Sequence, residues 1–317
     1  MADLETLGES SQRVCFCTAP DGVHIAYAVH GSGPPLVIAA CWLSHLQFDW
    51  QSPVWRHFLV DLGKVATVIR YDERGFGLSD REVYDHSLEA RISDLEAVVE
   101  HAGLDRFALM GMSQGGPVTI SYAHRHPERV TRLIFYGSYS GALHNATPED
   151  LEMEAAFDQL IKVGWARPDS EFRRVFTSLM IPSATSEQMA WLDELQRVST
   201  SAEIAVLSRR QRAQADATDL LADLHLPTLV LHARDDRMNH FTDGRFLASG
   251  IDGARFVPLE SSNHIVLGDE PAWPVFVDEV TKFLEPDRQT EDVPSVDVAA
   301  RLSSRELDVL KLAAQGL

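Results

Sequence analysis

Residues 106–118, RFALMGMSQGGPV, place one serine between glycines where two differently patterned segments meet. The apolar run before the serine is typical of a buried strand, and the residues after it favour a helix, whose first turn tolerates Pro117. Gly111 and Gly115 complete the pattern G-x-S-x-G. This pattern suits a sharp strand-to-helix turn, because larger side chains two residues from the serine would collide with the strained backbone. The stretch predicts that Ser113 is a nucleophile whose hydroxyl projects above a sheet edge.

Strand-like and helix-like runs alternate outward from this turn, which indicates an α/β fold with a doubly wound, mostly parallel sheet. The predicted strands are 12–18, 22–30, 36–40, 64–72, 106–112, 130–138, 226–233 and 254–260, and the predicted core helices include 87–103 and 273–284. Residues 139–225 contain four amphipathic helical stretches and no convincing strand, so we expect an inserted helical cap over the carboxyl edge of the sheet. The predicted division is a core of 1–138 and 226–286, a cap of 139–225, and a linker with a tail at 287–317.

A serine hydroxyl is a poor nucleophile unless a base takes its proton, and that base needs a group to orient it. On this architecture the expected chain order is serine, acid, histidine, with the last two in loops after late strands. The loop after 226–233 carries Asp235 and Asp236, and the loop after 254–260 carries His264. The sequence therefore predicts a Ser–His–Asp arrangement.

These segments resemble the capped serine-hydrolase branch of the α/β-hydrolase superfamily. Besides GMSQG, the stretch YDERGFGLSD (71–80) is similar to that superfamily's D-x-R-G-x-G-x-S segment, and LVLHARDDRM (229–238) to its late strand. There the acid occupies the fourth position of G-x-x-D, and with Ala233 in place of the glycine the match falls on Asp236 rather than Asp235. The resemblance covers about residues 12–285. It implies that His264 deprotonates Ser113, that Asp236 holds the imidazole, and that an acyl-enzyme forms.

The resemblance also implies an oxyanion hole made of the backbone N–H groups of Gln114 and Trp42. Relatives carry His-Gly after the third strand, whereas this chain has Ala40-Cys41-Trp42. A main-chain donor survives a change of side chain, but Cys41 in place of glycine narrows the loop. The departure leaves open a site that binds acyl ligands without turning them over.

Composition excludes several classes of partner. The 317 residues include 28 Lys and Arg against 47 Asp and Glu, a net charge of −19 that repels nucleic acid and anionic lipid. The amino terminus lacks the pattern of a secretory signal, and no apolar run approaches the about 20 residues that span a bilayer. Cys15 and Cys17, two apart on a strand, are poorly placed for a disulfide. We expect a cytoplasmic protein with three reduced thiols, no membrane contact, and neither metal nor cofactor.

The predicted cap supplies large apolar side chains for substrate binding: Trp165, Phe176, Met180 and Trp191. A helical lid with such residues favours small-to-medium acyl esters, and hence a serine hydrolase of carboxylesterase type. Perhydrolase, haloperoxidase-like and C–C bond hydrolase activities use the same three side chains and stay open. The cluster Arg209-Arg210-x-Arg212 favours a solvated helix face rather than an anion site.

The last seventeen residues, RLSSRELDVLKLAAQGL (301–317), predict a helix with a capping box at Ser303 and Glu306. This stretch resembles the first helix of a LuxR-type helix-turn-helix, with no recognition helix after it. It favours a second hypothesis: a ligand-sensing domain of a LuxR-type regulator with weak or no turnover. We expect no nucleic-acid partner for this chain. DNA binding by a longer parent protein and formation of a homo-oligomer are left open.

Overall fold

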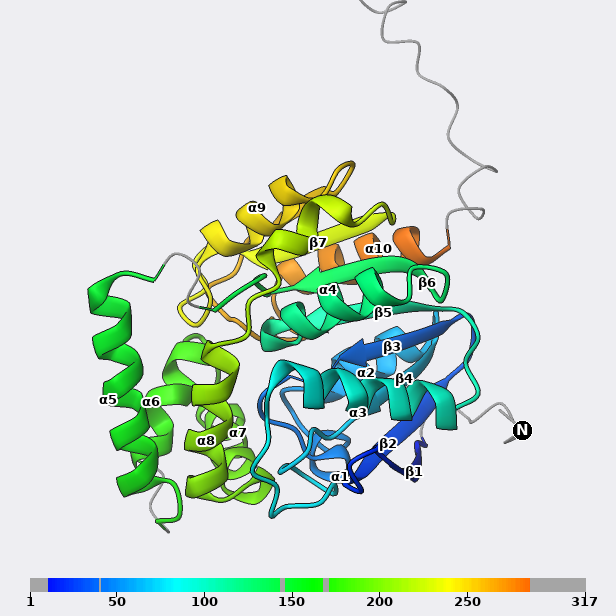
Figure 1. The fold of residues 1–317 in the computed structure, drawn as a ribbon. Coiled ribbons are helices and arrows are strands. Elements are labelled where there is room, and N and C mark those ends of the chain that lie inside the picture. Colours follow the sequence, from blue (N-terminus) through cyan, green and yellow to red (C-terminus); the bar gives the residue numbers. More distant parts are fainter. Residues whose placement is uncertain (1–10, 40, 143–145, 168–170, 286–317) are drawn as a thin grey trace, which may run out of the picture. The chain divides into compact units, whose positions relative to one another are not determined.

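The computed structural model describes residues 11–39, 41–142, 146–167 and 171–285, and in these ranges it contains one eight-stranded sheet (Figure 1). The strands are β1 (Arg13–Thr18), β2 (His24–Gly31), β3 (Pro35–Ala39), β4 (Thr67–Tyr71), β5 (Phe107–Met112), β6 (Val130–Tyr136), β7 (Thr228–Ala233) and β8 (Arg255–Leu259). Their spatial order is β1-β2-β4-β3-β5-β6-β7-β8. Strand β2 is antiparallel to both of its neighbours, and all other pairs are parallel. The predicted α/β fold is confirmed.

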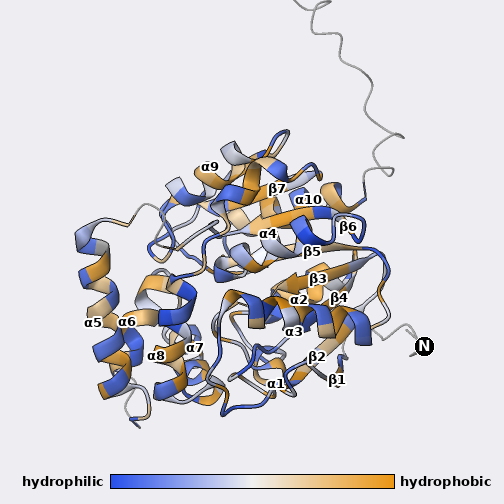
Figure 2. Cartoon of the chain, viewed as in Figure 1, coloured by the Kyte–Doolittle hydropathy of each residue, from blue (hydrophilic) through white to orange (hydrophobic). Residues whose placement is uncertain are grey.

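Helices cover both faces of this sheet, which explains why its central strands are continuous apolar runs (Figure 2). On β5, Leu109 packs on the side of α3 (Leu88–His101), α4 (Gly116–Arg125) and α9 (Phe241–Gly250). Its neighbour Met110 packs on the opposite side, with α2 (Arg56–Gly63) and α10 (Ala272–Leu284). Because side chains alternate along a strand, one run of sequence fills two separate cores.

Four helices between β6 and β7 form the cap: α5 (Pro148–Gly164), α6 (Glu171–Met180), α7 (Ser186–Ser199) and α8 (Ala202–Ala213). They lie together beside the sheet (Figure 1), and their inner side chains join the core on the α2 side. The backbone N–H of His264 donates to the Met180 carbonyl oxygen at 2.8 Å. The cap is thereby hydrogen-bonded to the loop that carries the predicted base.

Two core helices, α2 and α9, are absent from the sequence prediction. Helix α9 has the sequence FTDGRFLASG, whose two glycines disfavour a helix in isolation. Gly244 is required by packing, because a Cβ there would overlap the imidazole of His232 on β7. Close approach of the helix to the strand therefore overrides helix propensity.

No helix among the described residues is both long enough and apolar enough to cross a membrane. The helix predicted at 301–317, with its resemblance to a DNA-binding segment, lies outside the described residues.

Candidate active site

Ser113 occupies the turn between β5 and α4 in a backbone conformation that only glycine adopts without strain. Its φ is +51°, and it is the only non-glycine residue with positive φ in the described part of the chain. The short 3-10 turn η1 (Ser113–Gly115) leads directly into α4. The left-handed conformation costs a non-glycine residue about 1–2 kcal/mol, so the surrounding packing holds the serine there.

Glycines on both sides allow this turn, but the close contacts differ from those that the sequence suggested. A Cβ at Gly111 would lie 2.7 Å from the hydroxyl oxygen of Thr119, on the helix that follows. A Cβ at Gly116 would overlap the carbonyl oxygen of Tyr139. The glycines are thus required by the approach of α4 to the sheet and of the loop after β6 to α4.

Hydrogen bonds to backbone carbonyl groups hold the turn from two sides. The Ser138 hydroxyl donates to the Ser113 carbonyl oxygen at 2.5 Å, and Arg91 donates through Nη2 to the Gln114 carbonyl oxygen at 3.0 Å. Arg91 is itself paired through Nε with Glu73, 3.2 Å away. The loop after β6 and helix α3 therefore fix the two peptide units that follow Ser113.

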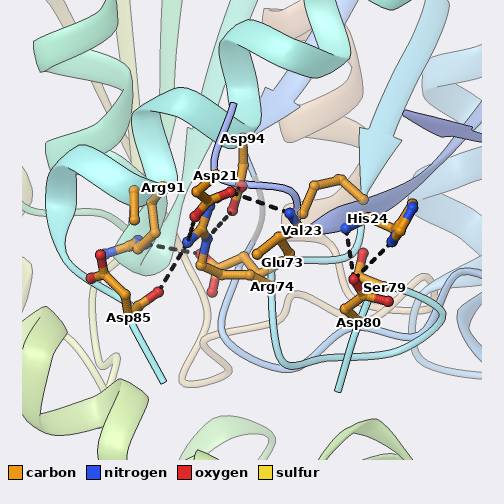
Figure 3. Close-up of polar contacts among 12 residues, drawn as sticks. Asp21, Val23, His24, Glu73, Arg74, Ser79, Asp80, Asp85, Arg91 and Asp94 are labelled. Carbon is orange, nitrogen blue, oxygen red and sulfur yellow. Dashed lines mark hydrogen bonds and ion pairs between the residues drawn. The ribbon is translucent and has the colours of Figure 1, made fainter. Parts of the chain in front are cut away.

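A second buried arginine fixes the loop that contains Glu73 (Figure 3). Arg74 donates from Nε and Nη2 to both carboxylate oxygens of Asp94, at 2.8 and 2.6 Å, and from Nη1 to Asp21 at 2.8 Å. Burial raises the pKa of Asp94 to about 6, against the lowering effect of Arg74. Arg74, the arginine of the D-x-R-G segment, thus holds this loop in place through its contacts with Asp94 and Asp21.

Asp236 and His264 come from loops after β7 and β8 and meet in a buried hydrogen bond. His264 Nδ1 donates to Asp236 Oδ2 at 2.7 Å, since a carboxylate can only accept. Asp236 Oδ1 accepts from the backbone N–H groups of Met238 and Asn239, at 2.8 and 3.1 Å. Asp235, the alternative in the sequence, is exposed. Because the proton of the neutral imidazole is on Nδ1, Nε2 is unprotonated and can accept a proton.

The environment of Asp236 favours the ionised carboxylate. Burial raises the pKa of Asp236, but the charge and hydrogen bond of His264 outweigh it, so the pKa lies below its ordinary value. A second imidazole, His232, is fully buried with Nε2 3.5 Å from Asp236 Oδ2 and 3.1 Å from the Asn239 carbonyl oxygen. Burial lowers the pKa of His232, so this ring is neutral and packs against the carboxylate.

Gly137, directly after β6, makes room for this pair. Its φ is +54°, and a Cβ there would lie 3.0 Å from His264 Cε1 and 3.6 Å from Asp236 Oδ2. Sequence reasoning did not select Gly137, although a glycine at the carboxyl end of a central parallel strand is a signal for close approach.

The hydroxyl of Ser113 is hydrogen-bonded to an amide. Asn239 Nδ2 lies 3.3 Å from Ser113 Oγ and 2.6 Å from the Gly137 carbonyl oxygen. In the described residues no hydrogen bond joins Ser113 Oγ to His264, although both residues line one cavity. Proton transfer between them requires Oγ and Nε2 to come within hydrogen-bond distance. Hydrogen bonds between catalytic groups often form fully only with substrate bound.

The cavity has a volume of about 620 Å³ and lies between the sheet edge and the cap. Trp42 and Gln114, the predicted oxyanion residues, both line it. Cys41 lines it as well, but burial raises the pKa of its thiol to about 12, and Sγ donates to the Leu43 carbonyl oxygen at 3.6 Å. This thiol is neutral at ordinary pH and unsuited to act as a second nucleophile.

Of the four predicted substrate-binding residues, Met180 lines the cavity and the other three lie outside its wall. The Trp165 indole N–H donates to the Thr200 carbonyl oxygen at 2.9 Å. Phe176 packs on Trp42, with ring centroids 5.5 Å apart, and Trp191 packs on Phe48 at 3.6 Å. Other apolar cap residues that line the cavity include Phe157, Leu160, Val175 and Leu179.

The prediction that the arginine cluster is a solvated helix face is wrong for two of its three members. The side chains of Arg209 and Arg212 are 11% and 3% exposed and line the cavity, whereas that of Arg210 is 56% exposed. Residues three apart share a helix face, so Arg209 and Arg212 point inward together.

No group of three or more His, Cys, Asp or Glu in the described ranges is arranged to hold a metal ion.

Comparison with known proteins agrees with this geometry. Residues 34–271 match the family model of the alpha/beta hydrolase fold. The chain is 29% identical over 233 residues to a non-heme haloperoxidase of Rhodococcus erythropolis, covering 70% of this chain and 82% of that protein. It is 28% identical over 219 residues to a 2-hydroxy-6-oxo-2,4-heptadienoate hydrolase of Pseudomonas putida, covering 66% and 71%.

Among solved structures, an esterase from Exiguobacterium antarcticum superposes with a TM-score of 0.72 at 20% identity, covering 86% of this chain and all of that one (100%). This likeness supports the fold alone. The strained serine turn, the sheet order and the family match together show that the chain belongs to the α/β-hydrolase fold family.

Proposed function

We propose that this protein is a serine hydrolase of carboxylesterase type, which cleaves small-to-medium acyl esters. One observation carries the proposal: Ser113, whose backbone is strained, lines the same cavity as His264. His264 Nδ1 lies 2.7 Å from Oδ2 of the buried Asp236. Strain at one residue and burial of a charged pair both cost free energy, and such costs concentrate at functional sites.

In the proposed reaction, Ser113 Oγ turns to His264, gives its proton to Nε2 and attacks the ester carbonyl carbon. The backbone N–H groups of Gln114 and Trp42 stabilise the oxyanion, and Asp236 stabilises the imidazolium. His264 then protonates the leaving alcohol, and the acyl group remains on Ser113. A water molecule, deprotonated by His264, releases the acid and restores the serine.

The walls of the cavity match this class of substrate in size and polarity. A volume of about 620 Å³ falls within the range of pockets for small ligands. Apolar side chains from the cap, such as Phe157 and Leu160, face the sheet edge that carries Ser113. A short acyl chain fits beside them.

A ligand-sensing role is the second candidate, and a specific contact favours it. Ser113 Oγ accepts from the Asn239 amide at 3.3 Å, and among the described residues no hydrogen bond joins it to His264. A site in which this contact persists with ligand bound would bind acyl compounds and turn them over slowly or not at all. The names of two relatives, a non-heme haloperoxidase and a 2-hydroxy-6-oxo-2,4-heptadienoate hydrolase, keep haloperoxidase-like and C–C bond hydrolase activities as further candidates.

Hydrolysis of p-nitrophenyl butyrate by the wild type and by Ser113→Ala tests the proposal. We expect turnover by the wild type and a loss of at least about a thousandfold in the variant. Ser249→Ala, an exposed serine on α9, is the matched control and should keep full activity. Turnover that survives in Ser113→Ala would contradict the proposal, and saturable binding without turnover in either protein would support the sensor.

A further inference from the structure

Unpartnered polar atoms gather at the cavity, and all of them are of one kind. Among the described residues that line it, the buried side-chain atoms without a hydrogen-bond partner are Trp42 Nε1, Gln114 Nε2, Arg209 Nε, Arg212 Nε and Arg212 Nη1. Each of these nitrogens is a donor, and no unpartnered acceptor accompanies them. A buried donor without a partner is costly, and an acceptor oxygen of a ligand that reaches these nitrogens would relieve that cost.

The charges behind this wall leave a cation in excess. Arg212 pairs through Nη2 with Glu73, and the same carboxylate pairs with Arg91. Two guanidinium groups therefore share one carboxylate, and Arg91 Nη1 also lacks a partner. The neighbouring Arg209, by contrast, has carboxylates of its own in Glu154 and Asp158.

The excess charge persists at neutral pH. Burial lowers the pKa of Arg212 to about 10, while Glu73 raises it and Arg91 lowers it further, so the guanidinium stays protonated. Burial raises the pKa of the Cys41 thiol and of the Tyr139 phenol, so neither supplies a compensating negative charge. Within the group formed by Arg212, Arg91 and Glu73, one positive charge is therefore in excess.

Gln114 places this cluster beside the reacting atoms. It follows Ser113 in the chain, its carbonyl oxygen accepts from Arg91, and it is one of the residues that line the cavity. Arg212 is linked through Glu73 and Arg91 to the peptide unit that follows Gln114, so a ligand group bound at Arg212 would share the cavity with an acyl group on Ser113. A carboxylate combines two acceptor oxygens with a single negative charge, which matches both the donors and the excess charge.

We propose that Arg212 and Gln114 form a carboxylate subsite, and that the preferred substrates are esters whose acyl group carries a second, free carboxylate. This inference rests on the proposed hydrolase function and names its substrate class. The net charge of −19 does not exclude an anionic substrate. At physiological ionic strength, salt screens exposed charges beyond about 8 Å, whereas the subsite would contact the ligand directly.

The test compares monoethyl glutarate with ethyl 5-oxohexanoate, in which an uncharged acetyl group replaces the carboxylate. Ethanol release gives kcat/KM for both esters. We expect the wild type to prefer the anionic ester by at least about tenfold, and Arg212→Gln to remove that preference mainly through KM. The matched control, Arg210→Gln, changes an exposed arginine of the same helix and should keep the preference.

A second variant gives a change of opposite sign. Glu73→Gln removes the shared carboxylate and should tighten binding of the anionic ester by at least about threefold. The Glu73→Gln variant also tests the carboxylate subsite if Arg212→Gln fails to fold. Equal kcat/KM ratios in the wild type and Arg212→Gln, or weaker anion binding in Glu73→Gln, would overturn the subsite.

Binding to Ser113→Ala, measured by calorimetry with the same two esters, separates the subsite from the proposed function. Charge-selective binding without turnover by the wild type would leave the subsite intact and contradict the hydrolase. Turnover of both esters with no charge preference in either assay would contradict the subsite alone.

Discussion

At the scale of single residues, the positions of Ser113 and His264 depend on neighbouring residues that have no side chain. Ser113 has a φ of +51°, and Gly137 has a φ of +54° against the ring of His264. The sequence predicted Ser113, Asp236 and His264 because motif and chain order specify those positions. It did not predict Gly137, Asn239 or Arg212, whose roles depend on which segments approach one another in three dimensions.

Gly137→Ala tests this exclusion. A Cβ would lie 3.0 Å from His264 Cε1, so the imidazole must shift, and we expect kcat/KM to fall about tenfold or more. The strained φ should also lower the free energy of unfolding by about 1–2 kcal/mol. Ester hydrolysis and urea unfolding measure the two effects.

Gly103→Ala is the matched control, because its φ is +68° and a Cβ there would meet nothing within 4 Å. It should lose similar stability and keep its kcat/KM. Equal activity in the two variants would show that Gly137 does not position the base.

At the scale of elements, hydrophobic periodicity located the strands and cap helices but not the wall of the cavity. Helical spacing identifies an inward face, yet Phe176 lies behind Trp42 while Phe157 reaches the cavity. The same spacing turns Arg212 inward, although arginines three apart were expected to be solvated. Composition could not reveal this burial, because the compensating Glu73 lies far away in the sequence.

The loop before α3 contains a buried histidine that links folding stability to pH. His86 is fully buried, donates through Nε2 to the Val83 carbonyl oxygen at 3.0 Å, and packs on Phe76. Burial, and then the charge of Arg212, lower the pKa of His86 from 6.5 to about 4. Between these values the unfolded chain binds more protons at this residue than the folded chain, so His86 contributes stability above pH 6.5 that is lost as the pH falls toward 4.

His86→Gln should therefore flatten the decline of stability on acidification. Between about pH 6 and 4.5, the free energy of unfolding of the wild type should fall more steeply than that of the variant, by up to about 1.4 kcal/mol per pH unit. Urea titrations at several pH values measure both slopes. Parallel pH dependences of the two proteins would show that His86 is not held neutral by the fold.

At the scale of the whole molecule, three segments far apart in the chain converge at the carboxyl edge of the sheet. Ser113 follows β5, Asp236 follows β7 and His264 follows β8, and parallel strands bring these ends to one side. The alternation of strands and helices in the sequence was enough to predict this convergence. The distances between the three side chains were not predictable, because they depend on loop conformation.

We propose that His264 and Asp236 activate Ser113 as a nucleophile, and the rate at which Ser113 is covalently labelled tests this most directly. Diethyl p-nitrophenyl phosphate should release one equivalent of nitrophenol from the wild type and leave a phosphoryl group that mass spectrometry locates on Ser113. His264→Gln should label at least about a thousandfold more slowly. Labelling of another residue, or an unchanged rate in His264→Gln, would contradict the account.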